Sequence, residues 1–375
     1  MLGDYGKVVT GNTPPTKDIE NYENGTYLWA SPADLGTHKL ISETKTKLSS
    51  KGFTKTRPLS KGSVLVTCIG STIGKTGMAT REMSTNQQIN SIVVNENNDN
   101  EFVYYVVQSA FPHYLSSIAV QAVPIISKSS FELLPSKRPS LQEQNKIGKF
   151  LSLLDERIST QHRLIEDLKK FKCAIVENVL NNRHSRMIRL GDIGSYIRGL
   201  TYSSNDVVEQ NGTFIMRSNN IVNGCSLDYY NDVVSVNKRI SKEQMLQNGD
   251  IIICMANGCS ALVGKSSFYD GKCPRSITVG AFCGIYRSEE PIVKWLFQTN
   301  RYRRYIWNSL QGGNGAIANL NGEDILRMSF PIPDAPVKNN CVKLLTSVDF
   351  MIENATSLCV LYTSQKEYLL RQMFI

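Results

Sequence analysis

The sequence lacks the marks of several common protein classes. Its nine cysteines form no C-x-x-C pair, and it has only four histidines, His38, His113, His162 and His184. Zinc sites and disulfide frameworks need regularly spaced ligands or cysteines, so we expect neither and interpret the cysteines as buried thiols. No run of about 18 apolar residues occurs, which predicts no transmembrane helix. The first residues, MLGDYGKVVTG, contain no apolar stretch of signal-peptide length.

Signatures of catalysis are also missing. The Asn/Asp-Pro-Pro-Tyr/Phe motif of adenine methyltransferases is absent, and the only Pro-Pro pair is Pro14-Pro15 in NTPPT. No G-x-S-x-G nucleophile elbow and no H-E-x-x-H zinc motif occur. No acidic cluster with a lysine partner resembles a nuclease site. The sequence therefore predicts no catalytic residue, no metal and no cofactor in this chain.

One stretch imitates a nucleotide-binding loop, VLVTCIGSTIGKTG at residues 64–77. In the G-x-x-x-x-G-K-[ST] pattern, successive N–H groups wrap the phosphates. Here Ile69 stands where the first glycine belongs, so the loop is one residue short. A second copy, IIICMANGCSALVGKSS at residues 251–267, is too long. We interpret both as a strand, a hairpin loop and a Gly-Lys turn, with a nucleotide hydrolase as the weaker alternative.

What the chain does have is the composition of a soluble globular protein with a basic charge. It is 41% hydrophobic and 20% charged, with a formal net charge of +9. Its 375 residues favour two domains, each able to bury its own core. The positive charge suits a polyanionic partner but does not prove one.

The chain is also internally duplicated. Four segments recur in the same order: LGDYGKVVTGNT at Leu2 and LGDIGSYIRGLT at Leu190, YLWAS at Tyr27 and FIMRS at Phe214, LSKGSVLVTC at Leu59 and LQNGDIIICM at Leu246, FVYYVVQS at Phe102 and IVKWLFQT at Ile292. Conserved order makes chance a poor explanation and predicts two related domains.

A long helix is predicted after each copy, because apolar residues recur there at heptad spacing. Some 35 residues at ~1.5 Å each would span roughly 50 Å. Only Gln161 and Lys172 interrupt the first seam, and Lys366 falls at the position equivalent to Lys172. The seam residues expected to pack are Ile147, Leu151, Leu154, Ile158 and Leu168 in the first helix and Leu345, Val348, Ile352 and Leu369 in the second. The alternative is an amphipathic helix packed on its own domain.

Apolar residues off the seam favour a partner that docks on the helices. They are Leu153, Leu164, Phe171 and Ala174 in the first helix and Leu344, Leu358, Leu361 and Leu370 in the second.

The predicted fold class is α+β, with two pseudo-twofold-related globular domains separated by two long antiparallel coiled-coil helices. The expected boundaries are 1–138 for the first globular domain, 139–184 for the central helix, 185–333 for the second globular domain and 334–375 for the C-terminal helix. Prolines before each helix, at Pro135, Pro139, Pro331, Pro333 and Pro336, end the preceding strand.

Each globular half offers side chains suited to DNA. Arg or Lys reads guanine and Asn or Gln reads adenine, whereas phosphates need only Lys and Arg. The candidates are Lys45, Lys47, Lys51, Lys55, Arg57, Lys75, Asn86, Gln87 and Gln88 in the first half and Arg217, Asn219, Asn220, Lys238, Arg239, Lys265, Arg275 and Asn314 in the second. The alternatives are that the lysines form a solvated surface and that the amides cap turns.

The segment NRYRRYIWNSL, residues 300–310, mixes arginines with aromatic residues. Helical spacing places Tyr302, Tyr305 and Ile306 on one face, which predicts core packing with the arginines outside. Those arginines could still reach phosphates.

Over nearly its whole length the chain resembles the DNA-specificity subunit of type I restriction–modification systems. The resemblance rests on LGD..G.V..G.TP (2–14), LSKGSVLVTCIGSTIGKTGMA (59–79), AVPIISKSSFELLP (122–135) and PSLQEQNKIGKFLSLLDERI (139–158). The Pro-x-x-x-Glu-Gln-x-x-Ile start of the helix is the most specific. The second copy departs from it, with Lys338-Asn339 in place of Glu143-Gln144, and we expect its helix to dock more weakly.

This resemblance implies a role. Each globular half would be a target-recognition domain that reads one half of a split double-stranded DNA target, and the helices would set the gap. The helices would dock two copies of a methylation subunit, which binds S-adenosylmethionine and methylates adenine, and restriction subunits would join for cleavage. This chain would itself catalyse nothing, bind no membrane and work in a prokaryotic cytoplasm. The alternative is a stand-alone regulatory or structural DNA-binding protein without a methyltransferase partner.

Overall fold

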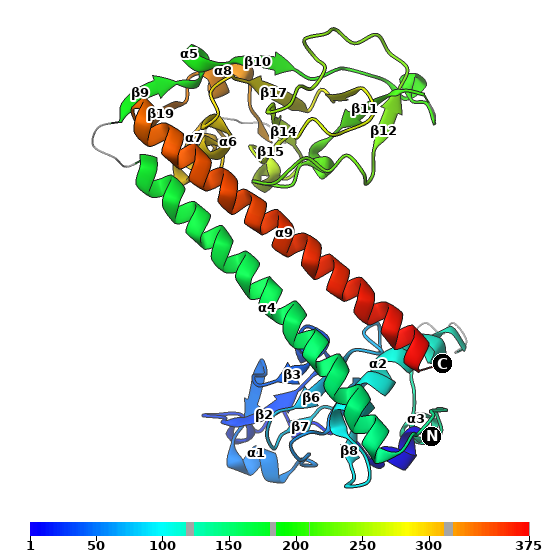
Figure 1. Ribbon diagram of the computed structural model, residues 1–375. Coiled ribbons are helices and arrows are strands. Elements are labelled where there is room, and N and C mark those ends of the chain that lie inside the picture. The colour runs from blue at the N-terminus through cyan, green and yellow to red at the C-terminus, as the bar shows by residue number, and fades with distance from the viewer. Residues whose placement is uncertain (118–123, 181–184, 210, 311–317, 375) are drawn as a thin grey trace. The chain divides into compact units, whose positions relative to one another are not determined.

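The computed structural model describes residues 1–117, 124–180, 185–209, 211–310 and 318–374 (Figure 1). The chain forms two compact units. The first unit is Met1–Arg163 together with Thr356–Ile375, and the second unit is Leu164–Ala355. Each unit therefore contains one globular half and a part of each long helix.

Two long helices are present, α4 (Leu141–Leu180) and α9 (Ala335–Met373) (Figure 1). In the first unit the start of α4 packs beside the end of α9, where Asp155 pairs with Lys366 at 2.7 Å. In the second unit the end of α4 meets the start of α9, where Lys172 pairs with Asp349 at 3.1 Å. The two helices are therefore antiparallel. Because α4 has no internal proline, its backbone hydrogen bonds continue for 40 residues.

The predicted seam residues lie on the inner faces of these helices. Five are buried, Leu151, Leu154, Leu168, Leu345 and Val348, and four are half-buried, Ile147, Ile158, Ile352 and Leu369. Of the residues expected off the seam, Leu370 instead packs against the core of the first unit, together with Leu369. The other described off-seam leucines and Phe171 are exposed.

The first unit contains a five-stranded sheet and a three-stranded sheet. The larger sheet has the order β1 (Gly6–Thr10), β8 (Ile89–Val94), β5 (Val64–Thr67), β6 (Thr76–Ala79) and β3 (Leu40–Ile41), and the smaller has β4 (Thr46–Leu48), β2 (Tyr27–Ala30) and β7 (Ser84–Thr85). The short helices are α1 (Ser50–Thr54) and α3 (Lys128–Glu132), and α2 (Asn100–Ser117) is the longer one.

The second unit repeats this strand order, which is structural evidence for the duplication. Its sheets are β10 (Ser195–Arg198), β17 (Cys283–Arg287), β13 (Ile251–Cys254) and β15 (Ser266–Phe268), and β12 (Val234–Val236), β11 (Thr213–Met216) and β16 (Ile277–Val279). The parallel pair β2·β7 is matched by the parallel pair β11·β16. The other elements are β9 (Arg186–Arg189) with β19 (Ser329–Ile332), β14 (Ala256–Asn257) with β18 (Ala318–Asn319), α5 (Leu190–Ile193), α6 (Val293–Leu296), α7 (Asn300–Leu310) and α8 (Gly322–Leu326).

Each unit has its own core. In the first, residues of β5 pack with Phe102 and Tyr105 of α2 and with Leu151 of α4. In the second, Ile253 of β13 packs with Trp295 of α6 and with Leu345 of α9. The long helices thus supply core residues to both units, which fixes them to the globular parts.

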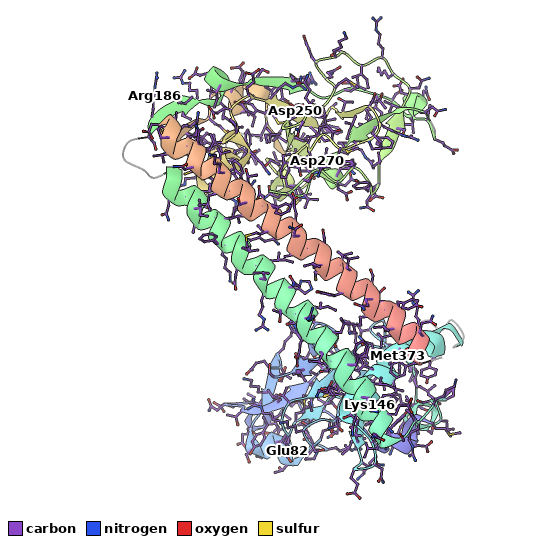
Figure 2. The ribbon with its side chains drawn as sticks, in the orientation of Figure 1. Glu82, Lys146, Arg186, Asp250, Asp270 and Met373 are labelled. Carbon is purple, nitrogen blue, oxygen red and sulfur yellow. The ribbon has the colours of Figure 1, made fainter. Side chains whose placement is uncertain are left out.

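In the second unit an ion pair also joins β17 to the residue that precedes β13. Arg287 contacts both carboxylate oxygens of the buried Asp250, at 2.8 and 2.7 Å. Asp250 is labelled in Figure 2. A bidentate contact of this kind fixes the orientation of both side chains and neutralises the buried carboxylate.

Both Gly-Lys segments are hairpin turns, as the sequence predicts. Lys75 O accepts the Thr67 N–H at 2.9 Å, and Lys265 O accepts the Cys254 N–H at 2.9 Å. A strand follows each turn, β6 or β15, whereas a phosphate-binding loop leads into a helix. Gly74 and Gly264 have φ values of 89° and 80°, which favour glycine.

The two long helices are anchored to their units by different chemistry. The buried Gln144 donates to Asn98 Oδ1 at 3.1 Å and accepts the Asp99 N–H at 3.1 Å. At the start of α9, Lys338 instead forms an ion pair with Glu290 at 2.7 Å. The Lys338-Asn339 departure therefore exchanges an amide anchor for a charged one.

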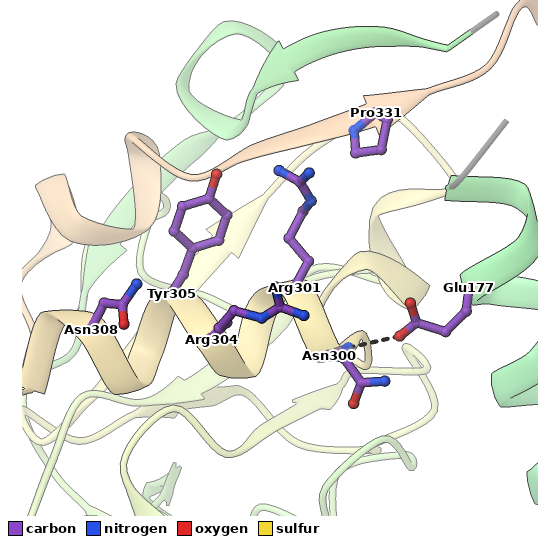
Figure 3. Close-up of a pocket in the computed structure, with 7 residues that line it drawn as sticks. All are labelled: Glu177, Asn300, Arg301, Arg304, Tyr305, Asn308 and Pro331. Carbon is purple, nitrogen blue, oxygen red and sulfur yellow. Dashed lines mark hydrogen bonds between the residues drawn. The ribbon is translucent and has the colours of Figure 1, made fainter. Parts of the chain in front are cut away.

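Helix α4 also anchors α7 in the second unit. Glu177 Oε1 accepts the backbone N–H of Asn300 at 2.8 Å, at the first turn of α7 (Figure 3). A carboxylate at this end satisfies a free N–H and opposes the positive end of the helix dipole.

Helix α9 and the cysteines differ from what the composition predicts. By length and composition alone, one helix among the described residues could cross a membrane, and it is α9. The sequence predicted no transmembrane helix because it has no unbroken apolar run. Helix α9 differs because its mean hydropathy is high although it contains charged residues. All nine cysteines are free thiols, but only Cys68, Cys254, Cys283 and Cys359 are buried.

Candidate nucleic-acid interface

In the first unit three segments meet beyond the end of β1, and we call this place the first junction. It consists of residues 10–13, 55–57 and 86–88. Asn12 donates from Nδ2 to Lys55 O at 2.8 Å, and Arg57 donates from Nη1 to Thr10 O at 2.7 Å. Thr13 donates to Gln87 Oε1 at 2.5 Å. The structure therefore brings Lys55, Arg57 and the amide loop together, although they lie far apart in sequence.

The second unit has an equivalent second junction, made of residues 198–204, 217–219, 238–244 and 280–283. Lys238 donates to Thr201 O at 2.9 Å, and Gln244 donates to Arg198 O at 3.2 Å. The junction encloses a cavity of about 520 Å³ whose lining includes Ser203, Arg217 and Asn219.

Backbone hydrogen bonds show that the two junctions are copies of one another. Gly11 N–H donates to Ile89 O at 3.1 Å, and Gly199 N–H donates to Cys283 O at 3.2 Å. A Cβ atom on Gly11 would lie 2.2 Å from Asn86 O, and one on Gly199 would lie 2.1 Å from Gly280 O. Only glycine fits where the backbone of another loop comes this close. This contact explains why both LGD segments carry a glycine at this position, Gly11 in the first and Gly199 in the second.

Two of the predicted amide residues face inward. Asn86 is buried, and it accepts the Gln88 N–H and donates to Gln88 Oε1, both at 3.0 Å. Asn220 is buried, accepts the Arg217 N–H at 2.9 Å and donates to Asn231 O at 2.8 Å. These two side chains hold their loops in shape, which is the turn-capping alternative.

The neighbours of these amides are the accessible members of each cluster. Gln87 and Asn219 are exposed, and Gln88 and Arg217 are half-buried. Arg217 donates from Nη2 to Asp232 O at 3.0 Å, while its Nε is sealed from solvent and has no hydrogen-bond partner. Gln87 and Asn219, with the accessible parts of Gln88 and Arg217, are therefore what the two clusters offer to a ligand.

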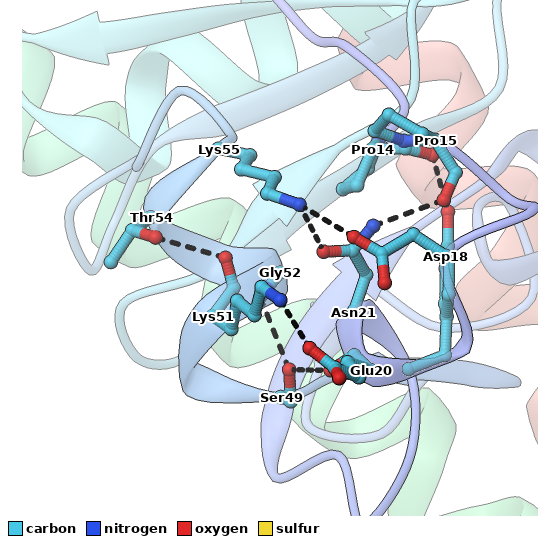
Figure 4. A network of polar contacts seen from close by, with 11 residues as sticks. Pro14, Pro15, Asp18, Glu20, Asn21, Ser49, Lys51, Gly52, Thr54 and Lys55 are labelled. Atoms are coloured by element: carbon cyan, nitrogen blue, oxygen red, sulfur yellow. Dashed lines mark hydrogen bonds and ion pairs between the residues drawn. The ribbon is translucent and has the colours of Figure 1, made fainter.

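Nearby carboxylates neutralise three of the five cations in the predicted lysine run, and Figure 4 shows the contacts of two of them, Lys51 and Lys55. Lys51 pairs with Glu20, Lys55 pairs with Asp18 at 2.8 Å, and Lys47 pairs with Glu43 at 2.7 Å. The hydrogen bond from Lys55 lowers the pKa of the Asp18 carboxyl. Lys45 and Arg57 are exposed, and the described contact of the Arg57 guanidinium is to a backbone oxygen.

The remaining predicted cations are more scattered. Lys238 lies 3.7 Å from Asp206, Arg239 is exposed, and the Arg275 guanidinium lies 5.1 Å from the centre of the Phe214 ring. The exposed Lys75 lines a separate cavity of about 1080 Å³ with residues of α4. Lys265 is half-buried in its Gly-Lys turn, and Asn314 lies outside the described residues.

Helix α7 packs as its spacing predicts. Tyr302 and Ile306 are buried, whereas Arg301, Arg303 and Arg304 are exposed. Arg301, Arg304 and Asn308 line a cavity of about 370 Å³ on this helix (Figure 3).

Phe282 and Ser203 also line the second junction, although neither is among the residues predicted from the sequence. An alignment of the two halves beyond their shared motifs would have pointed to Phe282. The segments STNQQINSIVV and TVGAFCGIYR are equivalent, and Phe282 stands where the first half has Gln88. Within the described ranges no group of three or more His, Cys, Asp or Glu residues could hold a metal ion.

Residues 1–170 match the family described as type I restriction modification DNA specificity domain. The type I restriction enzyme MjaIX specificity subunit of Methanocaldococcus jannaschii is 28% identical over 183 residues, 47% of this chain and 42% of that protein. The EcoKI specificity subunit of Escherichia coli is 32% identical over 149 residues, 38% of this chain and 31% of that protein. The chain thus spans less than half the length of these two relatives. The MjaVIII specificity subunit of M. jannaschii is 21% identical over 389 residues, 94% of this chain and 86% of that protein.

Solved structures share the fold at low identity. The S subunit of a type I restriction–modification system from M. genitalium has a TM-score of 0.63 at 14% identity, covering 100% of this chain and 95% of that one. A chain from a study of the assembly and conformational transition of the type I system has a TM-score of 0.54 at 15% identity, covering 98% and 95%. Residues 1–170 thus match a type I restriction modification DNA specificity domain, and the whole chain shares the fold of the solved S subunit.

Proposed function

We propose that this chain selects the DNA target of a type I restriction–modification complex, and that each unit reads one half of a bipartite, gapped sequence. One observation carries the proposal: the same junction occurs twice with different side chains. The loop that presents Gln87 and Gln88 in the first junction presents Ala281 and Phe282 in the second, where Arg217 and Asn219 line the same cavity. A repeated backbone with different side chains suits two different half-sites.

The side chains of both junctions suit base edges. Glutamine and asparagine pair with adenine in the major groove, and arginine pairs with guanine. Arg57 and Arg239, which are exposed beside the junctions, suit phosphates. The net charge of +9 supports the same polyanionic partner.

The long helices act as the spacer in this proposal. A helix of 40 residues is about 60 Å long, which exceeds one turn of DNA at ~34–36 Å. The number of helical residues between the units then sets the number of unread base pairs. The division at residues 138, 184 and 333 into two readers and two spacers belongs to this proposal.

The outer faces of the helices dock two copies of the methylation subunit. The first unit exposes Phe150 on α4 and Leu358 on α9, at 48% and 40%. The equivalent residues of the second unit, Leu344 and Leu164, are exposed at 46% and 42%. Since exposed apolar side chains mark interaction sites, a set of them that recurs at equivalent positions in each unit suits two copies of one partner.

These exposed residues also account for the apolar composition of α9 without a membrane. The methylation subunit supplies S-adenosylmethionine and the methyl transfer to adenine, restriction subunits supply cleavage, and the complex works in a prokaryotic cytoplasm. This chain contributes recognition and assembly rather than catalysis.

Modification-aware sequencing tests this function. DNA is sequenced from cells that express the chain with its methylation subunit, and the control cells lack the chain. We expect a gapped two-part methylated motif only when the chain is present. Replacing residues 1–138 or 185–333 with those of another specificity subunit should change only one half of the motif. An assembled complex that methylates no such motif would contradict the proposal and favour a stand-alone regulatory DNA-binding protein.

A further inference from the structure

Phe282 is an exposed aromatic residue held on a fixed backbone. Its side chain is 69% exposed. Its carbonyl accepts two N–H groups, from Met255 at 2.8 Å and from Ala256 at 3.2 Å. The neighbouring Gly280 and Cys283 are tied together by a hydrogen bond of 2.8 Å. The ring is therefore presented by a rigid turn, although exposing it brings no burial of apolar surface within this chain.

The same position in the first unit carries an amide. Gln88 O accepts the Cys68 N–H at 2.7 Å, just as Phe282 O accepts the Met255 N–H at 2.8 Å. Cys68 and Met255 occupy equivalent places after β5 and β13. The duplicated fold thus presents a hydrogen-bonding side chain in one unit and an apolar ring in the other, at one point of one loop.

The surroundings of Phe282 are polar and cationic. The cavity that it lines also contains Arg217, Asn219 and Ser203. Arg217 donates from Nη2 to Asp232 O at 3.0 Å, and Lys238 donates to Thr201 O at 2.9 Å at the same cavity. Phe282, with Tyr202 and Ala281, thus lies beside hydrogen-bond donors suited to bases and phosphates, and this mixture of apolar and cationic side chains favours DNA over an apolar protein surface as the occupant.

We propose that Phe282 determines specificity in the second half-site by contacting the C5-methyl group of a thymine. This inference rests on the proposed function, in which the second unit reads DNA. The thymine methyl is the apolar group that base pairs present in the major groove, and phenylalanine is one of the side chains that contact it. The position of Gln88 in the first unit then carries a hydrogen bond to a base rather than a methyl contact.

Deoxyuridine gives a direct test, since it removes only the methyl group from thymine. Once the methylated motif is known, each thymine of the second half-site is replaced in turn in a duplex, and binding of the assembled complex is measured. At one position we expect about fourfold weaker binding by the natural chain, the value of one buried methyl group. Phe282→Ala should bind the thymine and deoxyuridine duplexes equally at that position and should leave the first half-site unaffected.

A matched control and a conservative variant complete the test. Trp307→Ala removes another exposed aromatic residue of the second unit, on α7, and should keep the sensitivity to deoxyuridine. Phe282→Leu should keep part of it. A second half-site without thymine, or a sensitivity that persists in Phe282→Ala, would overturn the inference. Weaker binding by Phe282→Ala with no deoxyuridine effect would also overturn it, in favour of a wedge between base steps. If exchange of the second unit left the motif unchanged, the proposed function itself would fail.

Discussion

Lys172 Nζ of α4 lies 3.1 Å from Asp349 Oδ1 of α9, where the heptad pattern predicts an apolar residue. The equivalent pair, 194 residues away at each end, is Lys366 with Asp155 at 2.7 Å. An aromatic donor completes each site, because Trp295 Nε1 contacts Asp349 at 3.1 Å and Tyr105 OH contacts Asp155 at 2.6 Å. The two lysines that interrupt the seams, Lys172 and Lys366, thus make one duplicated polar contact that fixes the register of the helices.

The two copies of this contact differ in their second lysine. In the second unit Lys294 also pairs with Asp349, at 2.7 Å. In the first unit Lys39 donates to Tyr105 OH at 3.0 Å rather than to the aspartate. Burial, and then the hydrogen bond to Asp155, raises the pKa of the Tyr105 hydroxyl, so it remains a neutral donor at physiological pH.

Asp349→Ala should destabilise the second unit by about 3 kcal/mol, because it leaves two lysines and an indole N–H without their acceptor. Lys172→Met should cost much less, since Lys294 still neutralises the carboxylate. Urea unfolding followed by circular dichroism measures both. Asp167→Ala, which breaks an exposed pair with Lys170, is the control and should change stability by no more than about 0.5 kcal/mol. Equal costs for Asp349→Ala and Lys172→Met would contradict this account.

Gly11 and Gly199, each in close contact with a loop of its own junction, should affect recognition of different halves of the DNA target. Gly11→Ala places a Cβ against Asn86 O and should disturb only the first junction, while Gly199→Ala should disturb only the second. We expect each change to cost about 1–3 kcal/mol of stability in its unit and to degrade recognition of one half of the methylated motif. Modification-aware sequencing reports which half is affected. Gly258→Ala, where an added Cβ meets nothing, should leave both halves intact.

The sequence predicted the architecture well because duplication and heptad spacing are regular patterns. It did not separate Asn86 from Gln87, since neighbouring amides look alike until burial distinguishes the one that shapes the loop. Nor could local sequence show that Lys51 and Lys55 face Glu20 and Asp18, which lie more than 30 residues away. Phe282 was missed because the shared motifs do not extend to its loop, and an isolated apolar residue gives no local signal of exposure. Burial, ion pairing and exposure at these positions depend on contacts between segments that are far apart in the sequence.

The cysteines should divide by reactivity at pH 8. Burial raises the pKa of the Cys68 thiol to about 12, and burial likewise raises the pKa of Cys254 and Cys283. Because the thiolate is the nucleophile, these three residues stay protonated and should resist iodoacetamide. The exposed Cys173, Cys225 and Cys259 should react. Peptide mass spectrometry measures this. Labelling of Cys68 at the rate of Cys173 in the folded chain would contradict the buried position of the strand end.

The helix surfaces should bind methylation subunits independently. Phe150→Ser with Leu358→Ser should remove one of two copies, and Leu164→Ser with Leu344→Ser should remove the other. All four residues are exposed, so the free energy of unfolding should change by no more than about 0.5 kcal/mol. Native mass spectrometry gives the stoichiometry. Ile19→Ser with Val222→Ser, at exposed apolar positions outside the helices, should retain two copies. Retention of two copies by both helix variants would exclude these patches as docking sites.

The paired and unpaired cations of the first unit should differ in their effect on DNA binding. Arg57 is exposed and contacts a backbone oxygen, whereas Lys51 already pairs with Glu20. Arg57→Ala should lower the slope of log K against log salt concentration by about 0.9, the value for one phosphate contact. The weakening should be similar for specific and non-specific duplexes, since a phosphate contact carries no sequence information. Lys51→Ala should leave the slope unchanged. Fluorescence anisotropy across a salt series measures both variants, and equal slopes for them would show that the ion pair with Glu20 does not persist on DNA.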